Sequence, residues 1–169
     1  MRVVLSIGSN LGDRLARLQS VVDGLGDALR AVSRVYETDA WGGVEQGPFL
    51  NAVLVADDPH RDAHAWLDFA HDMERAAERV REVRWGPRTL DVDLVTCRDG
   101  DAEVTVGDAV LALPHPMAHL RAFVMTPWLD VEPDATLTVA GEARPVARLL
   151  AELDQAERDG VRLTDAVLA

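Results

Sequence analysis

Residues 84–94 of this chain read RWGPRTLDVDL, which places two arginines and two aspartates within ten positions. The stretch from Thr89 to Cys97 is rich in β-branched and apolar residues, and this composition predicts a strand. Because side chains alternate between the faces of a strand, Asp91 and Asp93 are expected to point the same way, roughly 6.6 Å apart along the backbone. Two carboxylates at that distance repel by about 2.5 kcal/mol at an effective dielectric of ~20, so we expect a positive group between them. The pattern favours a magnesium-type ion held by carboxylates and phosphate oxygens, with arginines binding the phosphates.

The arginines distinguish this segment from a solvated strand edge, which is the more common meaning of two aspartates at this spacing. Residues 75–88 hold five arginines and two glutamates, although the whole chain has a formal net charge of −12. The acidic balance disfavours nucleic acid and anionic membranes as partners, and the local basic patch favours a small polyanion. All 17 basic residues are arginine, which excludes a P-loop lysine, the protein-kinase strand lysine and a Schiff-base mechanism.

Length and composition predict one globular domain over residues 1–169, since 48% of the residues are hydrophobic and 27% are charged. Cys97 is the only cysteine, so no intramolecular disulfide or cysteine-based zinc site is expected, and a cytoplasmic location fits. No apolar run has the length of a signal peptide or a membrane span, so we expect no membrane association.

The order of the predicted elements is βαββαβ, which a ferredoxin-like α+β sandwich accommodates. Ser9 and Asn10 are predicted to cap the first helix, and Gly26 is predicted to end it. Three glycines and a proline between Asp39 and Pro48 predict a loop of the kind that closes over ligands. The remaining predictions are strands at 2–8, 30–37 and 49–56, a long helix at 62–81, a hairpin of 102–106 with 111–113, and helices at 116–120 and 146–153. The last dozen residues give no assignment.

Four separated motifs occur together in this chain. They are GSNLGD at 8–13, FLNA at 49–52, RWGPRTLDVD at 84–93, and PHP at 114–116 followed by RAFV at 121–124. In this order they resemble the 6-hydroxymethyl-7,8-dihydropterin pyrophosphokinase family, over about residues 2 to 155. The resemblance implies a ferredoxin-like three-layer α/β/α sandwich with a mainly antiparallel sheet. It also implies transfer of pyrophosphate from ATP to a pterin alcohol in folate biosynthesis, with two magnesium ions and release of AMP.

The resemblance also assigns roles to residues. Asp91 and Asp93 match the metal pair, and with Arg79 and Arg88 they form the expected catalytic group. The residues that match the ATP site are Glu74, Arg81, Arg84, Trp85, Arg88, Leu94, His115 and Arg121. The residues that match the pterin site are Thr38, Trp41, Phe49, Asn51 and Phe123. Val110 and Ala112 stand where some relatives carry arginine and threonine toward ATP.

Physical chemistry supports these roles independently of the resemblance. A flat pterin ring has two π faces, and stacking is worth ~1–3 kcal/mol per face by analogy with nucleobases. The Asn51 side chain offers a donor and an acceptor, which an amide-like pterin edge requires. Either Asp93 or a metal-bound water is a candidate acceptor for the proton of the attacking hydroxyl.

The expected partners are therefore ATP and hydroxymethyldihydropterin, with no nucleic acid and no membrane, and the expected state is a monomer. Two other functions stay open at this stage. One is a catalytically dead pterin- or nucleotide-binding module, against which the presence of Asp91, Asp93 and Arg88 counts. The other is a ferredoxin-like nucleic-acid-binding domain, against which the negative charge counts.

Overall fold

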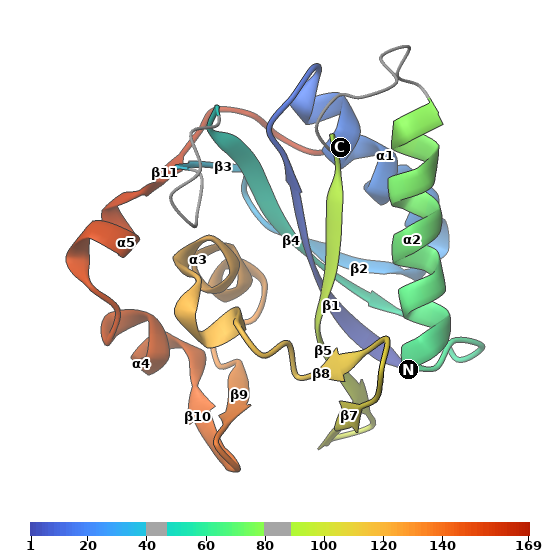
Figure 1. Cartoon of the computed structure of the whole chain (residues 1–169), viewed down its shortest axis with the longest axis vertical. Helices are drawn as coiled ribbons and strands as arrows, with labels where there is room; N and C mark the ends of the chain where they lie inside the picture. Colours follow the sequence, from blue (N-terminus) through green and yellow to red (C-terminus); the bar gives the residue numbers. More distant parts are fainter. Residues whose placement is uncertain (40–46, 80–88) are drawn as a thin grey trace.

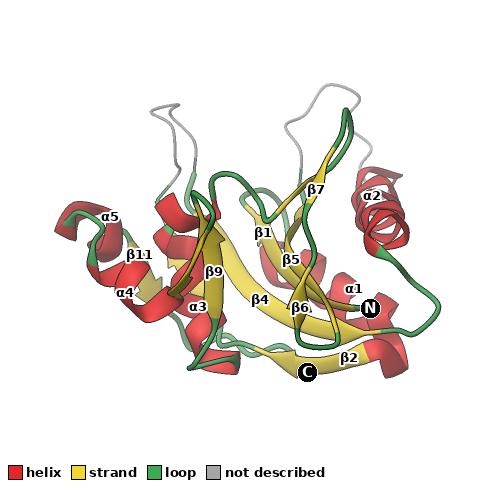
Figure 2. Cartoon of the chain, turned by 90° about the horizontal axis from the view of Figure 1, so that it is seen from below, coloured by secondary structure: helices red, strands yellow, loops and turns green. Residues whose placement is uncertain are grey.

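The computed structural model describes residues 1–39, 47–79 and 89–169, with helices on both faces of a central sheet (Figures 1 and 2). The first half contains β1 (Arg2–Ser9), α1 (Arg14–Leu25), η1 (Gly26–Ala28), β2 (Leu29–Val32), β3 (Tyr36–Thr38), β4 (Phe49–Asp57) and α2 (Ala63–Arg79). The second half begins with β5 (Asp91–Asp99), β6 (Ala102–Glu103), β7 (Val106–Gly107), β8 (Ala112–Leu113), η2 (Ala118–Leu120) and α3 (Ala122–Val131). It ends with β9 (Thr136–Val139), β10 (Glu142–Pro145), α4 (Val146–Ala151), α5 (Gln155–Asp159) and β11 (Val161–Leu163).

The central sheet has the strand order β11-β3-β4-β1-β5-β6 in the described ranges, and β2 also pairs with β4. Its pairings are antiparallel. Helices α1 and α2 cover one face of the sheet, and α3 covers the other (Figure 1). This arrangement confirms the expected ferredoxin-like α+β sandwich with three layers.

Side chains along the central strands alternate between the two faces of the sheet, so the core forms two clusters. Val3, Leu5 and Ile7 of β1 pack under α1 and α2 with the fully buried Trp66. Val4 of β1 faces the other way and packs with Trp128 of α3. Both faces of β1 are therefore covered, which explains why its sequence is almost continuously apolar.

The elements with clear periodicity occur as predicted. Strands β1 and β4 match the predicted strands at 2–8 and 49–56 to within one residue. Helix α2 places Trp66, Phe69, Ala70 and Ala77 against the sheet, as its helical spacing predicts. Helix α1 ends at Gly26, whose φ of 53° is a left-handed conformation that favours glycine.

Two local predictions in the first third of the chain were wrong. The cap of α1 is Asp13, whose carboxylate accepts a hydrogen bond of 3.1 Å from the Ala16 amide, and not Ser9 or Asn10. The predicted strand at 30–37 is interrupted between β2 and β3. There the Ser33 hydroxyl accepts the hydrogen bond of the Val53 amide, so a side chain replaces a backbone carbonyl in the ladder.

The prediction for residues 102–113 was correct only in part. Residues 106–107 pair with 112–113, whereas 102–103 pair with the end of β5. The elements that the sequence did not predict are η1, α3, the β9–β10 hairpin, α5 and β11. Among the helices in the described ranges, none combines the length and the apolar composition that crossing a membrane requires.

Candidate functional site

The face of the sheet under α3 changes from apolar to polar at one end. Along β1 this face carries Val4, then Ser6, then Gly8, and the register places Ser6 opposite Asp93 and Gly8 opposite both Asn51 and Asp91. Side chains of directly opposed residues lie on the same face of a sheet. The antiparallel pairing therefore gathers an amide, two carboxylates and a hydroxyl from three strands into one area.

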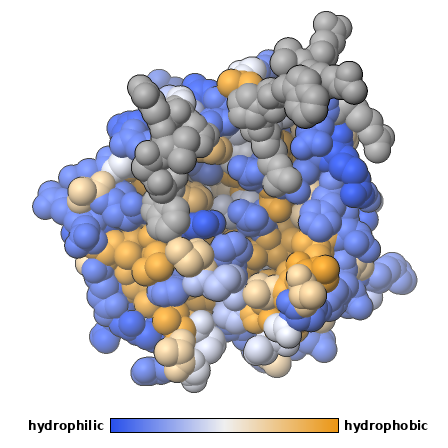
Figure 3. Space-filling view, in the orientation of Figure 1, coloured by the Kyte–Doolittle hydropathy of each residue, from blue (hydrophilic) through white to orange (hydrophobic). Residues whose placement is uncertain are grey.

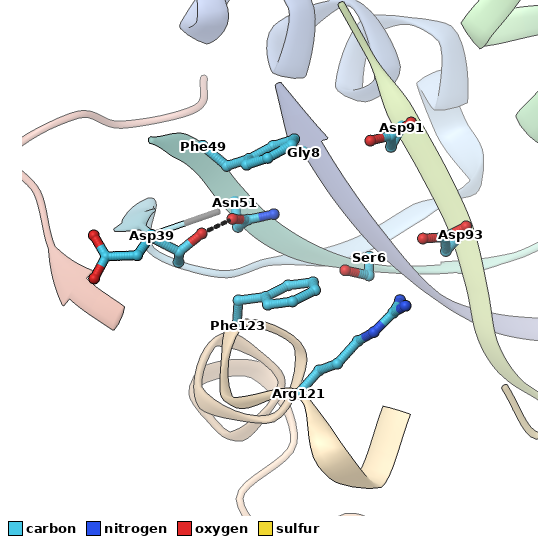
Figure 4. A pocket seen from close by; sticks show the side chains of 10 residues that line it. Ser6, Gly8, Asp39, Phe49, Asn51, Asp91, Asp93, Arg121 and Phe123 are labelled. Carbon is cyan, nitrogen blue, oxygen red and sulfur yellow. Dashed lines mark hydrogen bonds between the residues drawn. The ribbon is translucent and has the colours of Figure 1, made fainter. Parts of the chain in front are cut away.

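A pocket of about 320 Å³ opens over this polar area (Figure 4). Phe49, the first residue of β4, and Phe123, in the first turn of α3, lie on opposite sides of it. Asn51 lies between the two rings at the back of the pocket. Two aromatic faces with an amide at their edge are suited to a flat heterocycle that carries both donors and acceptors.

Asn51 is buried and its amide is already oriented. The Thr38 hydroxyl donates a hydrogen bond of 2.5 Å to Asn51 Oδ1, and Asn51 Nδ2 donates to the Ile7 carbonyl at 3.4 Å. Gly8 leaves room for this amide, since a Cβ atom at Gly8 would lie 2.6 Å from Asn51 Nδ2. The pocket is therefore preorganised by contacts between β1, β3 and β4.

Asp91 and Asp93 line the same pocket from β5, which agrees with the expectation that they point the same way. Both are partly exposed, and Arg121 points toward them from the start of α3 (Figure 4). The Arg121 guanidinium also lies 5.5 Å from the centroid of the Phe123 ring, within cation–π range. Two carboxylate donors on one strand fit a hard cation whose remaining ligands are phosphate oxygens and water.

A second pocket of about 330 Å³ also borders Asp93. Its lining residues come from α2, β5 and the segment after β7: Leu67, His71, Glu74, Val92, Asp93, Leu94, Val110, Leu111, Ala112, His115 and Pro116. Glu74 is buried there, and its carboxylate accepts a hydrogen bond of 3.1 Å from the Val92 amide. Among the residues that the structure describes, Asp93 is shared by the linings of the two pockets.

His115 is held in one orientation at this second pocket. Its amide donates to the Val95 carbonyl at 2.8 Å, and its Nδ1 accepts from the Met117 amide at 3.1 Å. Burial lowers the pKa of the imidazole, Asp93 opposes that shift, and Arg121 adds to it. The neutral ring with Nδ1 accepting carries its proton on Nε2, which leaves an N–H donor for a ligand.

The surface around both pockets is amphipathic. Figure 3 shows a hydrophilic strip between two apolar areas on the face seen in Figure 1. A ligand that combines an aromatic ring with a charged group matches such a surface better than a purely apolar ligand does.

The structure brings together most of the predicted site residues that it describes. Thr38, Phe49, Asn51 and Phe123 line the first pocket, and Glu74, Leu94 and His115 line the second. Arg121, expected among the ATP contacts, lines the first pocket beside the two aspartates. Trp41, Arg81, Arg84, Trp85 and Arg88 lie outside the described residues, and the structure describes Arg79 as the end of α2 but not its side chain.

Several lining residues were not among the predicted site residues. Ser6, Gly8 and Asp39 line the first pocket, and His71 lines the second. Because side chains alternate along a strand, Ser6 and Gly8 lie on the same face of β1 as Val4. The strand pattern alone could therefore have predicted that these two residues share a face. His71 lies one helical turn from Leu67 and Glu74, but a lone exposed histidine on a helix gives no such indication.

Comparison with known proteins gives consistent matches. The family model described as 7,8-dihydro-6-hydroxymethylpterin-pyrophosphokinase (HPPK) matches residues 4–133. The chain is 65% identical over 167 residues to the 2-amino-4-hydroxy-6-hydroxymethyldihydropteridine pyrophosphokinase of Mycobacterium tuberculosis, covering 96% of this chain and 89% of that protein. It is 35% identical over 134 residues to the protein of the same name from Aquifex aeolicus, covering 78% of this chain and 81% of that protein.

Solved structures show the same fold. The crystal structure of Plasmodium falciparum HPPK-DHPS A437G with STZ-DHP superimposes with a TM-score of 0.63 at 11% identity, over 89% of this chain. The present chain spans 45% of the length of that longer chain. At this identity the likeness concerns the arrangement of the helices and strands.

Proposed function

This chain belongs to the 7,8-dihydro-6-hydroxymethylpterin-pyrophosphokinase family, and we propose that its two pockets carry out the family reaction. The enzyme transfers pyrophosphate from ATP to the hydroxymethyl group of 6-hydroxymethyl-7,8-dihydropterin, which is a step of folate biosynthesis. The products are the pterin diphosphate and AMP. The observation that carries the assignment to this site is the position of Asp93, which lines both pockets.

The first pocket fits the pterin. Phe49 and Phe123 supply one stacking surface for each face of the ring, and Asn51 supplies the polar edge. Each stacked face is expected to contribute ~1–3 kcal/mol. The acceptor hydroxymethyl group then extends toward the aspartates of β5, because they border the side of the pocket away from Asp39 (Figure 4).

The second pocket fits the nucleotide. Leu94 and Leu111 offer apolar contacts, whereas His115 and the carboxylate of Glu74 offer polar ones. The Nε2–H of neutral His115 is placed to donate to a phosphate or ribose oxygen. The triphosphate then extends toward Asp93 and brings its β-phosphorus to the border between the pockets.

Magnesium is the proposed cofactor, as two ions that bind with ATP. Asp91 and Asp93 are the described residues that would hold it, and they fit because both carboxylates line one partly exposed pocket. Bound magnesium would neutralise phosphate charge and polarise the β-phosphoryl group for attack. Arg121 points at the same area and offers additional positive charge.

The transfer is an in-line displacement at the β-phosphorus. The hydroxymethyl oxygen forms a bond to that phosphorus, while the bond from the phosphorus to the oxygen bridging the α-phosphate breaks and its electron pair leaves with AMP. The hydroxyl proton must depart, and Asp93 is the described carboxylate that borders both substrates. No covalent enzyme intermediate is needed, since holding both substrates in line supplies much of the rate increase.

We also propose that the protein works in the cytoplasm as a monomer on small molecules. The formal charge of −12 opposes binding to nucleic acid. Size-exclusion chromatography with light scattering tests the monomer, and a dimer at micromolar concentration would contradict it.

The experiment that tests the proposed function measures products. The protein is incubated with ATP, magnesium and 6-hydroxymethyl-7,8-dihydropterin, and we expect one AMP for each pterin diphosphate formed. Asp93→Asn should lower the rate by ~10²-fold or more. Asp101→Asn, at the exposed β5–β6 turn, is the matched control and should keep the parental rate. A parent protein that binds both substrates but forms no AMP would indicate a binding module instead.

A further inference from the structure

Helix α3 carries Phe123 and begins without a local cap. Its N-cap residue is Arg121, whose side chain makes no capping hydrogen bond, and its first turn contains no acidic residue. The first amide groups of a helix have no partner within the helix and require one from elsewhere. In this chain the wall of the pterin pocket is such a helix start.

The missing partner comes from the C-terminal part of the chain. Glu157 of α5 accepts a hydrogen bond of 3.2 Å from the Ala122 amide, across 35 residues of sequence. A carboxylate at this position also complements the positive end of the helix dipole. Figure 1 shows α5 beside the start of α3, in agreement with this contact.

The same segment, residues 155–163, is also fixed to β3 and to Asp39, the residue that follows it. Strand β11 pairs with β3 so that Val161 lies opposite Thr38, and the Asp39 amide donates to the Gly160 carbonyl at 3.1 Å. Arg162 forms an ion pair of 3.1 Å with Asp39. Segment 155–163 therefore connects the strand that orients Asn51 with the helix that carries Phe123.

Phe123 lies where the core meets two pockets. It packs at the edge of the second core cluster and lines the pterin pocket. Together with Thr38 and Asp39 it also lines a smaller pocket of about 80 Å³, whose other lining residues are Ala156, Glu157, Gly160 and Val161. Part of the Phe123 surface therefore faces pockets and not packed side chains, so the position of the ring depends also on the backbone to which it is attached, and Glu157 contacts that backbone.

We propose that Glu157 is a positioning residue for the pterin: by holding the start of α3 it keeps Phe123 at the distance from Phe49 that a pterin ring requires. This inference rests on the proposed function, because it assumes that the pterin lies between the two rings. It differs from a purely structural cap in its consequence. Loss of a structural cap lowers stability alone, whereas loss of a positioning contact weakens the binding of one substrate and not the other.

The test compares Glu157→Ala, Glu157→Gln and the control Glu152→Ala, which removes an exposed glutamate that pairs with Arg144. Pterin affinity is titrated with a non-hydrolysable ATP analogue at saturation, and analogue affinity is titrated separately. KM and kcat are measured by AMP release. We expect Glu157→Ala to raise the pterin Kd and KM about three- to tenfold, with kcat and analogue affinity within about twofold of the parent.

Glu157→Gln should stay within about twofold of the parent, since its amide oxygen still accepts the Ala122 hydrogen bond. Glu152→Ala should behave like the parent in every titration. A Glu157→Ala protein that melts earlier but binds pterin normally would overturn the proposal, and so would an equal loss for both ligands. The parent protein separates the two hypotheses: absence of AMP release from the parent refutes the proposed function, whereas an active parent with unchanged Glu157→Ala kinetics refutes only the role of Glu157.

Discussion

The Thr38 hydroxyl donates a hydrogen bond of 2.5 Å to Asn51 Oδ1, and this contact between β3 and β4 orients the amide at the edge of the proposed pterin pocket. Both side chains are buried, so solvent does not compete with the bond. An amide that is oriented before the ligand arrives avoids part of the ordering cost of binding.

Thr38→Val keeps the shape of this side chain and removes the hydroxyl. Asn51 Oδ1 then lacks its partner, which typically costs ~1–3 kcal/mol when the group is buried. We expect the pterin Kd to rise by roughly five- to tenfold, with ATP-analogue affinity unchanged, because Thr38 does not line the nucleotide pocket. Thr38→Ser is the control, and calorimetric titration is the measurement. Equal pterin affinity for the valine and serine variants would contradict the role of this bond.

Gly8→Ala tests the space that the amide occupies. The added Cβ would lie 2.6 Å from Asn51 Nδ2 and 3.5 Å from Phe49 Cδ1, so the amide must move. Overpacking of this kind typically costs ~1–3 kcal/mol, and we expect pterin affinity to fall by about tenfold or more. Gly107→Ala is the matched control, since its Cβ meets nothing within 4 Å. Parental pterin affinity in Gly8→Ala would show that the Asn51 position is not critical.

Phe123→Ala separates a stacking role from a core role. Phe123 is only partly buried, at the edge of the second core cluster, so its loss should cost less than the ~3–5 kcal/mol typical of a buried aromatic. Pterin affinity should fall about 5- to 150-fold while analogue affinity stays near the parental value. Trp66→Ala, at a fully buried site on the other face, provides the stability reference. A large loss of stability in urea with unchanged pterin affinity would exclude the stacking role.

Removal of one carboxylate of the proposed metal site should lower activity far more than stability. Asp91→Asn keeps the shape of the side chain and removes only its charge at a partly exposed position, so its urea midpoint should stay close to that of the parent. Turnover should fall by ~10²-fold or more, and EDTA should abolish the turnover of the parent. A parent protein that keeps its full rate in EDTA would contradict the magnesium requirement. A near-parental rate for Asp91→Asn with magnesium present would contradict the carboxylate assignment.

Asp108 should make part of the free energy of unfolding depend on pH in the acid range. Its carboxylate accepts from the Val110 and Leu111 amides at 2.9 and 2.8 Å, and His64 Nε2 lies 2.7 Å from it. The Val110 amide first, then His64 and the Leu111 amide, lower the pKa of this carboxyl group. A carboxyl group whose pKa is lower in the folded than in the unfolded protein stabilises the fold at pH values above its unfolded pKa of ~3.9. This stabilisation is lost as the pH falls through the pKa of the folded state.

Asp108→Asn removes that contribution. The parent should melt at a higher temperature than this variant near pH 5, and the difference should narrow as the pH falls toward about 2. Asp101→Asn serves as the control because Asp101 lies exposed at the β5–β6 turn. Thermal melts across this range test the expectation, and a difference that stays constant or widens toward low pH would contradict it.

The sequence predicted those parts of the fold whose patterns are local. The alternation in β1 and the helical spacing in α2 each describe one element packed on one surface, and both elements occur as predicted. Helix α3 was not predicted because it is almost entirely apolar and contains Pro127, so its hydrophobic residues show no clear helical period. Strand β11 was not predicted because two of its three residues are exposed and because its partner, β3, lies more than 120 positions away in the sequence.

Some features of the candidate site likewise follow from the local sequence, and others do not. Asp91 and Asp93 are two positions apart on one strand, so their common direction follows from the sequence alone. The Thr38–Asn51 contact and the Glu157 contact with Ala122 depend on strand register and on helix placement, which the local sequence does not contain. The alternation of β1 predicts that Ser6 and Gly8 share one face of the strand. That this face belongs to a site follows only from the pairing of β1 with β4 and β5, which bring Asn51 and the two aspartates beside it.

In the proposed reaction the β- and γ-phosphates move together onto the pterin at the border between the pockets, which Asp93 marks. Labelled phosphates test this most directly: ATP labelled at the α-, β- or γ-position is supplied in turn, and the label is located in the separated products. We expect both the β-label and the γ-label in the pterin product, and the α-label only in AMP. Transfer of the γ-label alone, with ADP as the second product, would contradict this reaction.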